Sequence, residues 1–187
     1  MECFVDIELR PDPEFAAHLL LGALYTKLHR TLVTNNSTDI AVCFPGHQNR
    51  PPSLGTRMRL LGSRPALQTL TNTDWLSGMR DHVKVGALAH VPAGATHRTL
   101  RRVQAKSNPE RLRRRLMKRH GLDETQARER IPDNAAKTLN LPFLQLRSCS
   151  TGQTFRLFLS LGPEQPAPAS GEFNAYGLSQ NATVPWF

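Results

Sequence analysis

Residues 2–10, which read ECFVDIELR, alternate between apolar and polar side chains. Successive side chains of an extended strand point to opposite faces, so this alternation predicts a strand with one face buried. The next residues, Asp12-Pro13-Glu14, combine an N-capping side chain, a proline and an acid in the order typical of a helix start. Apolar residues then recur at helical spacing as far as about Val33, namely Phe15, Leu19, Leu24, Leu28 and Leu32. The chain therefore opens with a predicted strand and a predicted amphipathic helix.

The rest of the first half continues this alternation of element types. Turn residues separate three further apolar runs and a short helical segment. We predict strands at residues 39–44, 57–61 and 82–91, an exposed loop at 45–53 and a helix at 65–70. The order βαββαβ is that of the ferredoxin-like unit. Residues 1–94 are thus predicted to form a ferredoxin-like domain.

Composition shifts after Pro92-Ala93-Gly94, and residues 95–187 are predicted to form a second α+β domain. Its central feature is an arginine-rich helix over residues 108–120, which Asn108-Pro109-Glu110 starts and Gly121 ends. The other predicted elements are an extended segment at 99–105, a helix from 123, a hairpin of strands 143–147 and 155–161, and a last strand at 172–178. The predicted fold class of the whole chain is α+β.

The chain is strongly basic, and the excess charge lies almost entirely in its second half. It has 187 residues with 24 Lys and Arg against 15 Asp and Glu, a formal net charge of +9. Residues 1–96 hold nine basic and eight acidic side chains, whereas residues 97–187 hold fifteen and seven. The densest tract, at 98–119, has ten Lys and Arg, eight of them Arg, against a single acid. Such a tract predicts a polyanionic partner, and the excess of arginine favours bidentate contact with phosphates or guanine edges.

Several classes of protein are not expected. The apolar runs are shorter than the ~18 residues of a membrane-spanning helix, so no membrane partner is predicted. Acidic residues stand near the N-terminus where a secretory signal has cations, and the three cysteines are too few for a disulfide framework. We therefore expect a cytoplasmic protein. No cluster of Asp, Glu and His has the spacing of metal ligands, so we expect neither a metal ion nor another cofactor.

The predicted helix at 108–120 separates its charges from its apolar side chains. On a helical wheel the cations share one side: Arg111, Arg114, Arg115, Lys118 and Arg119. Leu112 and Leu116 lie beside them and predict a stripe that packs on the protein. A helix of this length spans about 20 Å, which suits a nucleic-acid groove where each neutralised phosphate releases counterions.

Upstream of that helix, Arg102 and Gln104 alternate on an extended segment and would point the same way. Arginine reads guanine and glutamine reads adenine through paired hydrogen bonds. The major groove of an A-form RNA duplex is too deep and narrow for side chains to read, except near the end of a short stem. If the partner is RNA, the helix at 108–120 could enter the groove only near the end of a short stem, which predicts a hairpin rather than a long duplex.

Several motifs give the chain a resemblance to the type I-F CRISPR repeat-processing endoribonucleases. The most specific motif is RRVQAKSNPERLRRRLM at residues 101–117. The others are LRPDPEF at 9–15, KLH at 27–29, LRS at 146–148, STG at 150–152, FRLF at 155–158, YGLS at 176–179 and VPWF at 184–187. The resemblance thus extends over essentially the whole chain.

This resemblance implies an enzyme that binds the stem-loop of each repeat in a CRISPR precursor transcript. It implies a cut at the 3′ base of the stem without metal, retention of the product, and assembly with the other subunits of the type I-F RNA-guided surveillance complex. The helix at 108–120 would lie in the major groove of the stem, while Arg102 and Gln104 would read the base pairs nearest the cut. Phe155 would stack beneath the terminal pair. Further RNA contacts are expected from Ser107, His120, Ser150 and Thr151.

By similarity, the catalytic group is His29, Ser148 and Tyr176. Metal-free cleavage uses the 2′-hydroxyl of the substrate as nucleophile and leaves a 2′,3′-cyclic phosphate and a 5′-hydroxyl. Histidine suits the general base, because its ordinary pKa is about 6.5. Ser148 would orient the 2′-hydroxyl, and Tyr176 would orient the imidazole through its own hydroxyl. Sequence pattern alone does not select His29 among the seven histidines, whereas the resemblance does.

Two other functions stay open at this point. A non-catalytic scaffold that only binds an RNA hairpin would need the same basic helix. A helix-turn-helix DNA regulator would use residues 108–120 as its recognition helix. The scaffold differs from an endoribonuclease in the role of His29, and the regulator differs in its affinity for duplex DNA.

Overall fold

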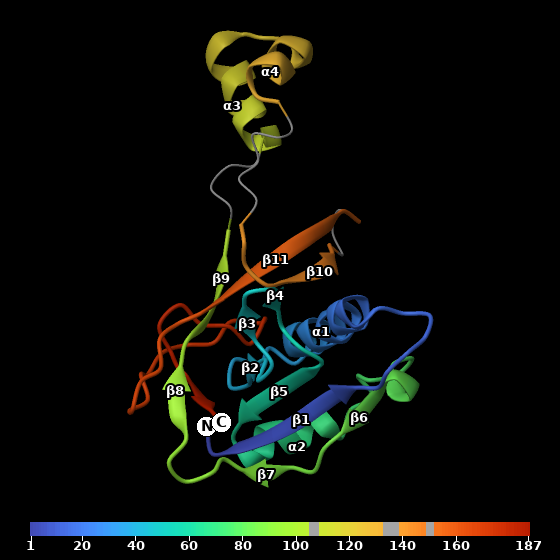
Figure 1. The fold of residues 1–187 in the computed structure, drawn as a ribbon, viewed down its shortest axis with the longest axis vertical. Helices are drawn as coiled ribbons and strands as arrows, with labels where there is room; N and C mark the ends of the chain where they lie inside the picture. The colour runs from blue at the N-terminus through green and yellow to red at the C-terminus, as the bar shows by residue number, and fades with distance from the viewer. Residues whose placement is uncertain (105–108, 133–138, 149–151) are drawn as a thin grey trace. The chain divides into compact units, whose positions relative to one another are not determined.

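The computed structural model describes residues 1–104, 109–132, 139–148 and 152–187, and it confirms a mixed α+β fold (Figure 1). The helices of these residues are α1 (Ala17–Thr34), α2 (Arg64–Thr71), α3 (Pro109–His120) and α4 (Glu124–Arg130), with a 3₁₀ turn η1 (Arg80–His82). The strands are β1 (Cys3–Leu9), β2 (Ala41–Cys43), β3 (Gln48–Asn49), β4 (Pro52–Ser53), β5 (Arg57–Gly62), β6 (Val83–Val85), β7 (Ala89–His90), β8 (Thr96–Arg98), β9 (Leu100–Val103), β10 (Phe143–Arg147), β11 (Thr154–Leu161) and β12 (Val184–Trp186).

Strand β1 is the centre of the main sheet. Neighbouring strands run in the order β2-β5-β1-β6, every pair is antiparallel, and β7 pairs with the other end of β1. The predicted alternation is confirmed, since its buried side chains are Cys3, Val5, Ile7 and Leu9. The single strand predicted at 82–91 is instead two strands. Val85 pairs with Ile7 but Ala89 pairs with Phe4, so one extra residue bulges out of the ladder between them.

Helix α1 begins later than the sequence predicts. Asp12 accepts hydrogen bonds from the backbone nitrogens of Glu14 and Phe15 at 2.8 and 2.9 Å, which makes these residues a turn before the helix. The buried face of α1 is Leu20, Leu21, Gly22, Leu24, Tyr25, Leu28 and Leu32. The spacing places Phe15 and Leu19 on the apolar face, but they are 46% and 43% exposed, because Phe15 lies in the turn before the helix and Leu19 lies beside the buried face.

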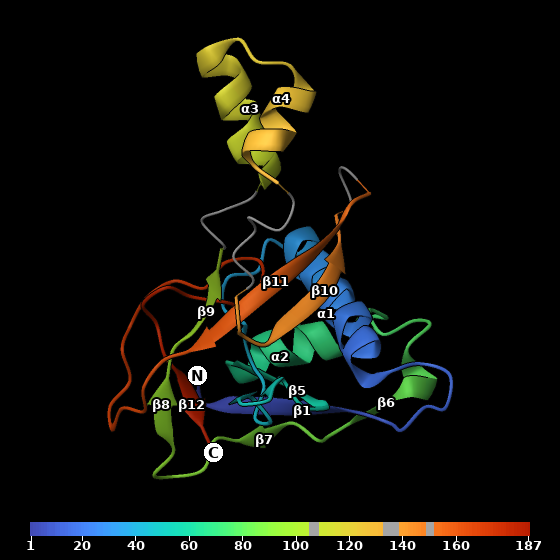
Figure 2. The same cartoon turned by 45° about the horizontal axis from the view of Figure 1, so that its top comes forward.

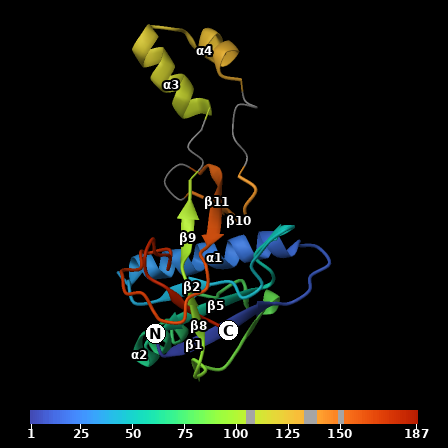
Figure 3. The same ribbon diagram turned by 60° about the vertical axis from the view of Figure 1, so that its left-hand side comes forward.

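The β10–β11 hairpin covers α1 on the side away from the main sheet (Figure 3). Helices α1 and α2 lie on one side of that sheet (Figure 2), and β9 completes a three-stranded sheet in the order β10-β11-β9. The hairpin predicted from the sequence is thus confirmed, with Leu144 facing Leu157 across it. A Cβ atom on Gly22 would overlap the carbonyl oxygen of Gln145 in β10. The glycine therefore allows the helix backbone to touch the hairpin.

The strand predicted at 172–178 is wrong, because these residues form a turn. The side-chain oxygen of Asn174 accepts hydrogen bonds from the backbone nitrogens of Tyr176 and Leu178, and Gly177 has a φ of +67°. An Asn side chain that bonds the backbone two residues ahead competes with strand pairing. The last strand is β12, which pairs with β8. The loop predicted at 45–53 contains the short β3–β4 hairpin.

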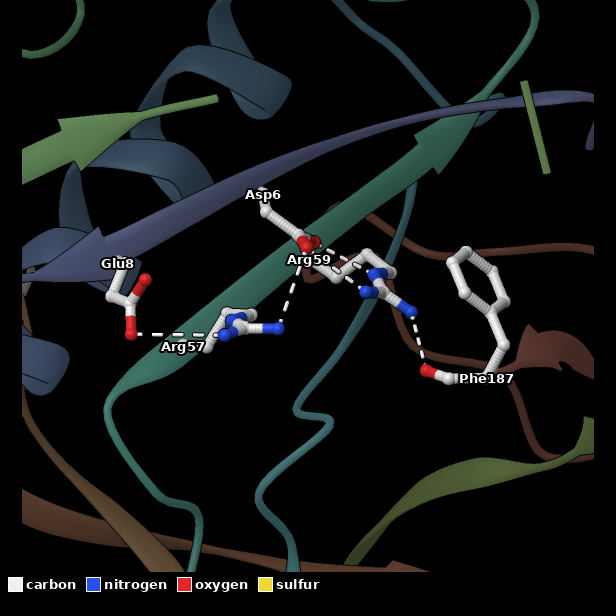
Figure 4. A network of polar contacts seen from close by, with 5 residues as sticks. All are labelled: Asp6, Glu8, Arg57, Arg59 and Phe187. Carbon is white, nitrogen blue, oxygen red and sulfur yellow. Dashed lines mark hydrogen bonds and ion pairs between the residues drawn. The ribbon is translucent and has the colours of Figure 1, made fainter. Parts of the chain in front are cut away.

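Arg59 of β5 joins the main sheet to Phe187 (Figure 4). Its buried guanidinium donates two hydrogen bonds to the Asp6 carboxylate, at 2.7 and 2.9 Å, and one to the backbone oxygen of Phe187 at 2.7 Å. It also lies 3.8 Å from the centroid of the Phe187 ring, which meets the ring of Phe4 edge-on. A buried charge is tolerated when it is paired and hydrogen-bonded in this way. The segment after β12 is thereby held against β1 and β5.

Close contacts divide the chain into two units, one of residues 1–102 with 141–187 and one of residues 103–140. Composition predicts a boundary after residue 94, but the β10–β11 hairpin packs on α1 and so joins the first unit. In the second unit α3 packs on α4. Gly121, at a φ of +65°, ends α3 as predicted, and a capping box between Asp123 and Gln126 starts α4.

Among the residues that the structure describes, no helix combines the length and the apolar character that crossing a membrane would require.

We predict that Gly22→Ala lowers the free energy of unfolding by about 2 kcal/mol, because the added methyl group overlaps the Gln145 backbone, which cannot move aside cheaply. Helix propensity alone would favour alanine by about 1 kcal/mol, so the contact must outweigh it. Denaturant titration measures the difference. Ala23→Gly at the neighbouring exposed position is the control, with an expected loss of about 1 kcal/mol. A Gly22→Ala variant that is as stable as the parent would contradict the close packing.

Candidate functional site

His29 lies near the end of α1 and is half-buried. Its Nδ1 atom is 2.8 Å from the backbone oxygen of Ala175. A carbonyl oxygen only accepts hydrogen bonds, so Nδ1 carries the hydrogen in this contact. In the neutral ring the other nitrogen, Nε2, is then the proton acceptor. The structure thus selects one tautomer of His29, and that tautomer suits a general base.

Tyr176 stacks on this imidazole. The ring centroids of His29 and Tyr176 are 3.8 Å apart, and the two planes differ by 9°. The sequence predicts that Tyr176 orients the imidazole through its hydroxyl, whereas the contact that the structure shows is made by the face of its ring. The imidazole is therefore fixed in two directions, by the Ala175 carbonyl in its plane and by the tyrosine ring over its face.

The turn that carries Tyr176 is anchored to the main sheet at Gly177. The backbone nitrogen of Val42 in β2 donates to the Gly177 carbonyl at 2.9 Å. A Cβ atom on Gly177 would lie 2.6 Å from Cγ2 of Val42, and the positive φ of Gly177 also disfavours any other residue. The motif YGLS at 176–179 thus contains a glycine that the close approach to β2 requires.

Tyr25 is a residue of this site that the sequence reasoning missed. Its side chain is fully buried, and its hydroxyl donates to the backbone oxygen of Tyr176 at 2.7 Å. Burial raises the pKa of Tyr25 well above its usual value, an effect that Tyr176 increases and the charge of Arg102 opposes. The hydroxyl therefore keeps its proton and stays a donor. Its position four residues before His29 was the available signal, because such residues share a helix face.

Ser148 follows β10, the strand against which α1 packs. Its side chain is half-buried. Its backbone closes the β10–β11 hairpin: its nitrogen donates to the Gln153 oxygen and its oxygen accepts from the Gly152 nitrogen, both at 2.9 Å. Of the three predicted catalytic residues, the structure brings His29 and Tyr176 into direct contact. A shared role with Ser148 stays a prediction.

Arg102 and Phe155 lie on neighbouring strands, β9 and β11. The guanidinium of Arg102 is 6.0 Å from the centroid of the Phe155 ring, at the outer limit of a cation–π contact. Phe155 is half-buried, in line with the fully buried Leu157 and Leu159 on the same face of β11. Part of the ring surface is therefore open to a stacking partner, and a cation lies close to it.

Helix α3 separates its side chains as the wheel predicts. Its exposed residues include all the cations proposed to meet RNA: Arg111, Arg114, Arg115, Lys118 and Arg119, with His120 at the end of the helix. Leu112 and Leu116 are half-buried. Arg113 is the exception within the arginine run, because it is buried and its Nε donates to the Ile131 oxygen at 2.7 Å. This arginine joins α3 to the end of α4.

For the remaining predicted RNA contacts, the structure gives the exposure of one residue. Gln104 is exposed. Ser107, Ser150 and Thr151 lie outside the described residues. Within the described ranges no group of three or more His, Cys, Asp and Glu side chains is placed to hold a metal ion.

Comparison with known proteins gives a consistent result. The family model of the CRISPR-associated protein Cas_Csy4 matches residues 4–187. The CRISPR-associated endonuclease Cas6/Csy4 of Pseudomonas aeruginosa (strain UCBPP-PA14) is 50% identical over 187 residues, which are 100% of both chains. The protein of the same name from Escherichia coli (strain UTI89 / UPEC) is 43% identical over the same length and coverage. The resemblance seen in the sequence is confirmed: the chain belongs to the Csy4 family of CRISPR-associated proteins.

Proposed function

We propose that this protein is a metal-independent endoribonuclease that cuts CRISPR precursor transcripts at the 3′ base of the repeat stem-loop. The observation that carries the proposal is the His29 imidazole, whose Nδ1–H is held by the Ala175 carbonyl and whose ring stacks on Tyr176. This arrangement leaves Nε2 to accept a proton. The names of its relatives, which are CRISPR-associated endonucleases, support the same class of reaction.

In the proposed reaction His29 Nε2 removes the proton of the 2′-hydroxyl next to the scissile phosphate. The resulting oxygen attacks phosphorus, the bond to the 5′-oxygen breaks, and that oxygen takes up a proton from water. The products are a 2′,3′-cyclic phosphate and a 5′-hydroxyl. Ser148 orients the 2′-hydroxyl by a hydrogen bond, and Tyr176 holds the imidazole plane. Orientation of this kind matters because small misplacements of reacting atoms cost much rate.

The stem of the repeat is bound by the cations of α3, which are exposed along the helix. Arg102 and Gln104 read the base pairs nearest the cut, and Phe155 stacks beneath the terminal pair, where stacking contributes about 1–3 kcal/mol per base. Ser107, Ser150, Thr151 and His120 add contacts to the same RNA. The enzyme then keeps the mature guide RNA and joins the other subunits of the type I-F surveillance complex in the cytoplasm.

The fold assignment that accompanies this proposal is a ferredoxin-like domain at residues 1–94 and an RNA-binding part at 95–187, whose β10–β11 hairpin packs on α1 of the first. The strand order β2-β5-β1-β6, with antiparallel neighbours, supports a ferredoxin-like sheet. The exposed cations of α3 support an RNA-binding role for the second part of the chain.

We expect the protein to cut a labelled repeat transcript at full rate in excess EDTA, because the proposed base and nucleophile need no metal. Mapping of the product ends checks the chemistry, with a 2′,3′-cyclic phosphate on the upstream fragment and a 5′-hydroxyl on the downstream one. A requirement for magnesium, or a 3′-hydroxyl product, would contradict the mechanism. Binding without any cut would favour the scaffold.

We expect His29→Ala to slow single-turnover cleavage by about 10²–10⁴-fold, the usual contribution of a general base, and to keep hairpin affinity within about twofold. His18→Ala is the matched control, since His18 is an exposed histidine of the same helix. It should cut normally. Equal cleavage by His29→Ala and the parent would show that another group is the base.

Equal affinity of the parent protein for matched DNA and RNA hairpins would favour a DNA regulator.

We expect Arg114→Met to reduce the slope of log affinity against log salt by about one, because an exposed cation that neutralises a phosphate releases counterions. Arg113→Met removes the same charge from a buried arginine that bonds Ile131. It should leave the slope unchanged and lower the thermal stability instead. Salt titrations of hairpin binding measure both. Equal loss of slope in the two variants would contradict the division between binding and structural arginines.

A further inference from the structure

Tyr25 and His29 make parallel contacts from one face of α1. They stand four residues apart, so their side chains lie one above the other on the helix. His29 bonds the carbonyl of Ala175 at 2.8 Å, and Tyr25 bonds the carbonyl of the next residue, Tyr176, at 2.7 Å. Helix α1 is therefore hydrogen-bonded to two consecutive carbonyl groups of the turn at 174–178.

These two bonds depend on each other through the backbone. The carbonyls of Ala175 and Tyr176 belong to adjacent peptide groups, which are each planar and meet at the Cα atom of Tyr176. The nitrogens of the same two groups are also held, that of Tyr176 by the Asn174 side chain at 2.9 Å and that of Gly177 by the Asn174 carbonyl at 2.7 Å. Because both groups are restrained in one short turn, a displacement of the Tyr176 carbonyl is passed to the Ala175 carbonyl. The Tyr25 hydroxyl fixes the Tyr176 carbonyl directly. Through the backbone it also sets the direction in which the Ala175 carbonyl faces the imidazole.

We propose that Tyr25 is a positioning residue for RNA cleavage, because its hydroxyl holds the Tyr176 carbonyl so that the Ala175 carbonyl accepts Nδ1–H of His29 and Nε2 stays the proton acceptor. This inference rests on the proposed role of His29 as the general base. Tyr25 itself does not meet the substrate. It acts through the tautomer and the direction of the imidazole.

The surroundings of Tyr25 suit a fixed donor. Its side chain is 0% exposed, and its ring lies 6.3 Å from the Tyr176 ring and 6.2 Å from that of Phe44. Burial raises its pKa, so the hydroxyl does not lose its proton in the working range of the enzyme. Without the Tyr25 hydroxyl, the Tyr176 carbonyl would lose its hydrogen-bond donor. A carbonyl left without a partner away from water is costly, so the backbone would tend to rearrange.

The turn has a second attachment that limits how far it can move. Val42 of β2 donates to the Gly177 carbonyl at 2.9 Å. Removal of the Tyr25 hydroxyl alone should therefore leave the turn folded and Tyr176 in place near His29. The expected change is a small rotation of the two peptide groups rather than loss of the site.

The test compares Tyr25→Phe with Thr26→Val. Tyr25→Phe removes only the hydroxyl and keeps the packed ring. Thr26 is the adjacent residue, and its hydroxyl bonds the Gly22 carbonyl at 2.8 Å within the same helix, so Thr26→Val removes a comparable bond that does not reach the turn. We expect Tyr25→Phe to cut about tenfold more slowly in single turnover, equivalent to ~1.4 kcal/mol, and to bind the hairpin with unchanged affinity. Thr26→Val should cut at the parental rate.

A spectroscopic measurement without RNA checks the route. ¹⁵N chemical shifts of His29, recorded above the pH at which the ring protonates, distinguish hydrogen on Nδ1 from hydrogen on Nε2. We expect the Nδ1–H form in the parent and in Thr26→Val, and a mixture of both forms in Tyr25→Phe. Parental cleavage by Tyr25→Phe would overturn the proposal. So would slower cleavage with an unchanged tautomer, because the hydroxyl would then act by another route.

The two variants distinguish failure of the Tyr25 proposal from failure of the proposed function. If His29→Ala cuts as fast as the parent, the assignment of the general base fails whatever Tyr25 does. If His29→Ala is inactive and Tyr25→Phe changes neither rate nor tautomer, the base assignment stands and the role of Tyr25 is refuted.

Discussion

The close packing of α1 between the main sheet and the β10–β11 hairpin is the constraint on which the site depends. Gly22 has no side chain, so the helix backbone meets the Gln145 carbonyl directly. Leucines along the helix, from Leu20 to Leu32, bury its other side in the core. With its axis fixed in this way, α1 brings Tyr25 and His29 to the turn at 174–178. A helix free to slide would carry the imidazole away from both of its partners.

Charge is used differently in the two units of the chain. In the first unit Arg59 is buried and paired with Asp6, so its charge serves the fold. In the second unit Arg113 is buried, whereas the neighbouring cations of α3 are exposed. Exposed like charges on one helix repel each other, and a polyanion removes that cost on binding. In the proposed function, affinity for RNA and the chemistry at His29 thus come from different parts of the sequence.

The sequence predicts those features of the fold that arise from local patterns. The alternation at residues 3–9, the turn residues between β10 and β11, and the cap at Gly121 all specify their elements from neighbouring residues. The start of α1 was misplaced because Asp12 caps a turn instead of the helix. The strand predicted at 172–178 failed for a similar reason, since the Asn174 side chain closes a turn there. Tyr25 was missed because its partner is 151 residues away, a distance at which periodicity carries no information.

The partner that orients His29 has a chemical consequence. In serine hydrolases a carboxylate holds the equivalent ring nitrogen, and its charge stabilises the protonated imidazole that forms during the reaction. A backbone carbonyl, like that of Ala175, fixes the same tautomer through its dipole but brings no net charge. A scissile phosphate already supplies a negative charge, and a carboxylate beside it would repel the substrate and favour the charged ring that cannot act as a base. In the proposed mechanism a carbonyl acceptor is therefore the better partner for a histidine that stays neutral until it meets an RNA hydroxyl. The direction of a carbonyl is set by the backbone that carries it. The orientation of the imidazole therefore depends on the contacts that hold the turn at 174–178.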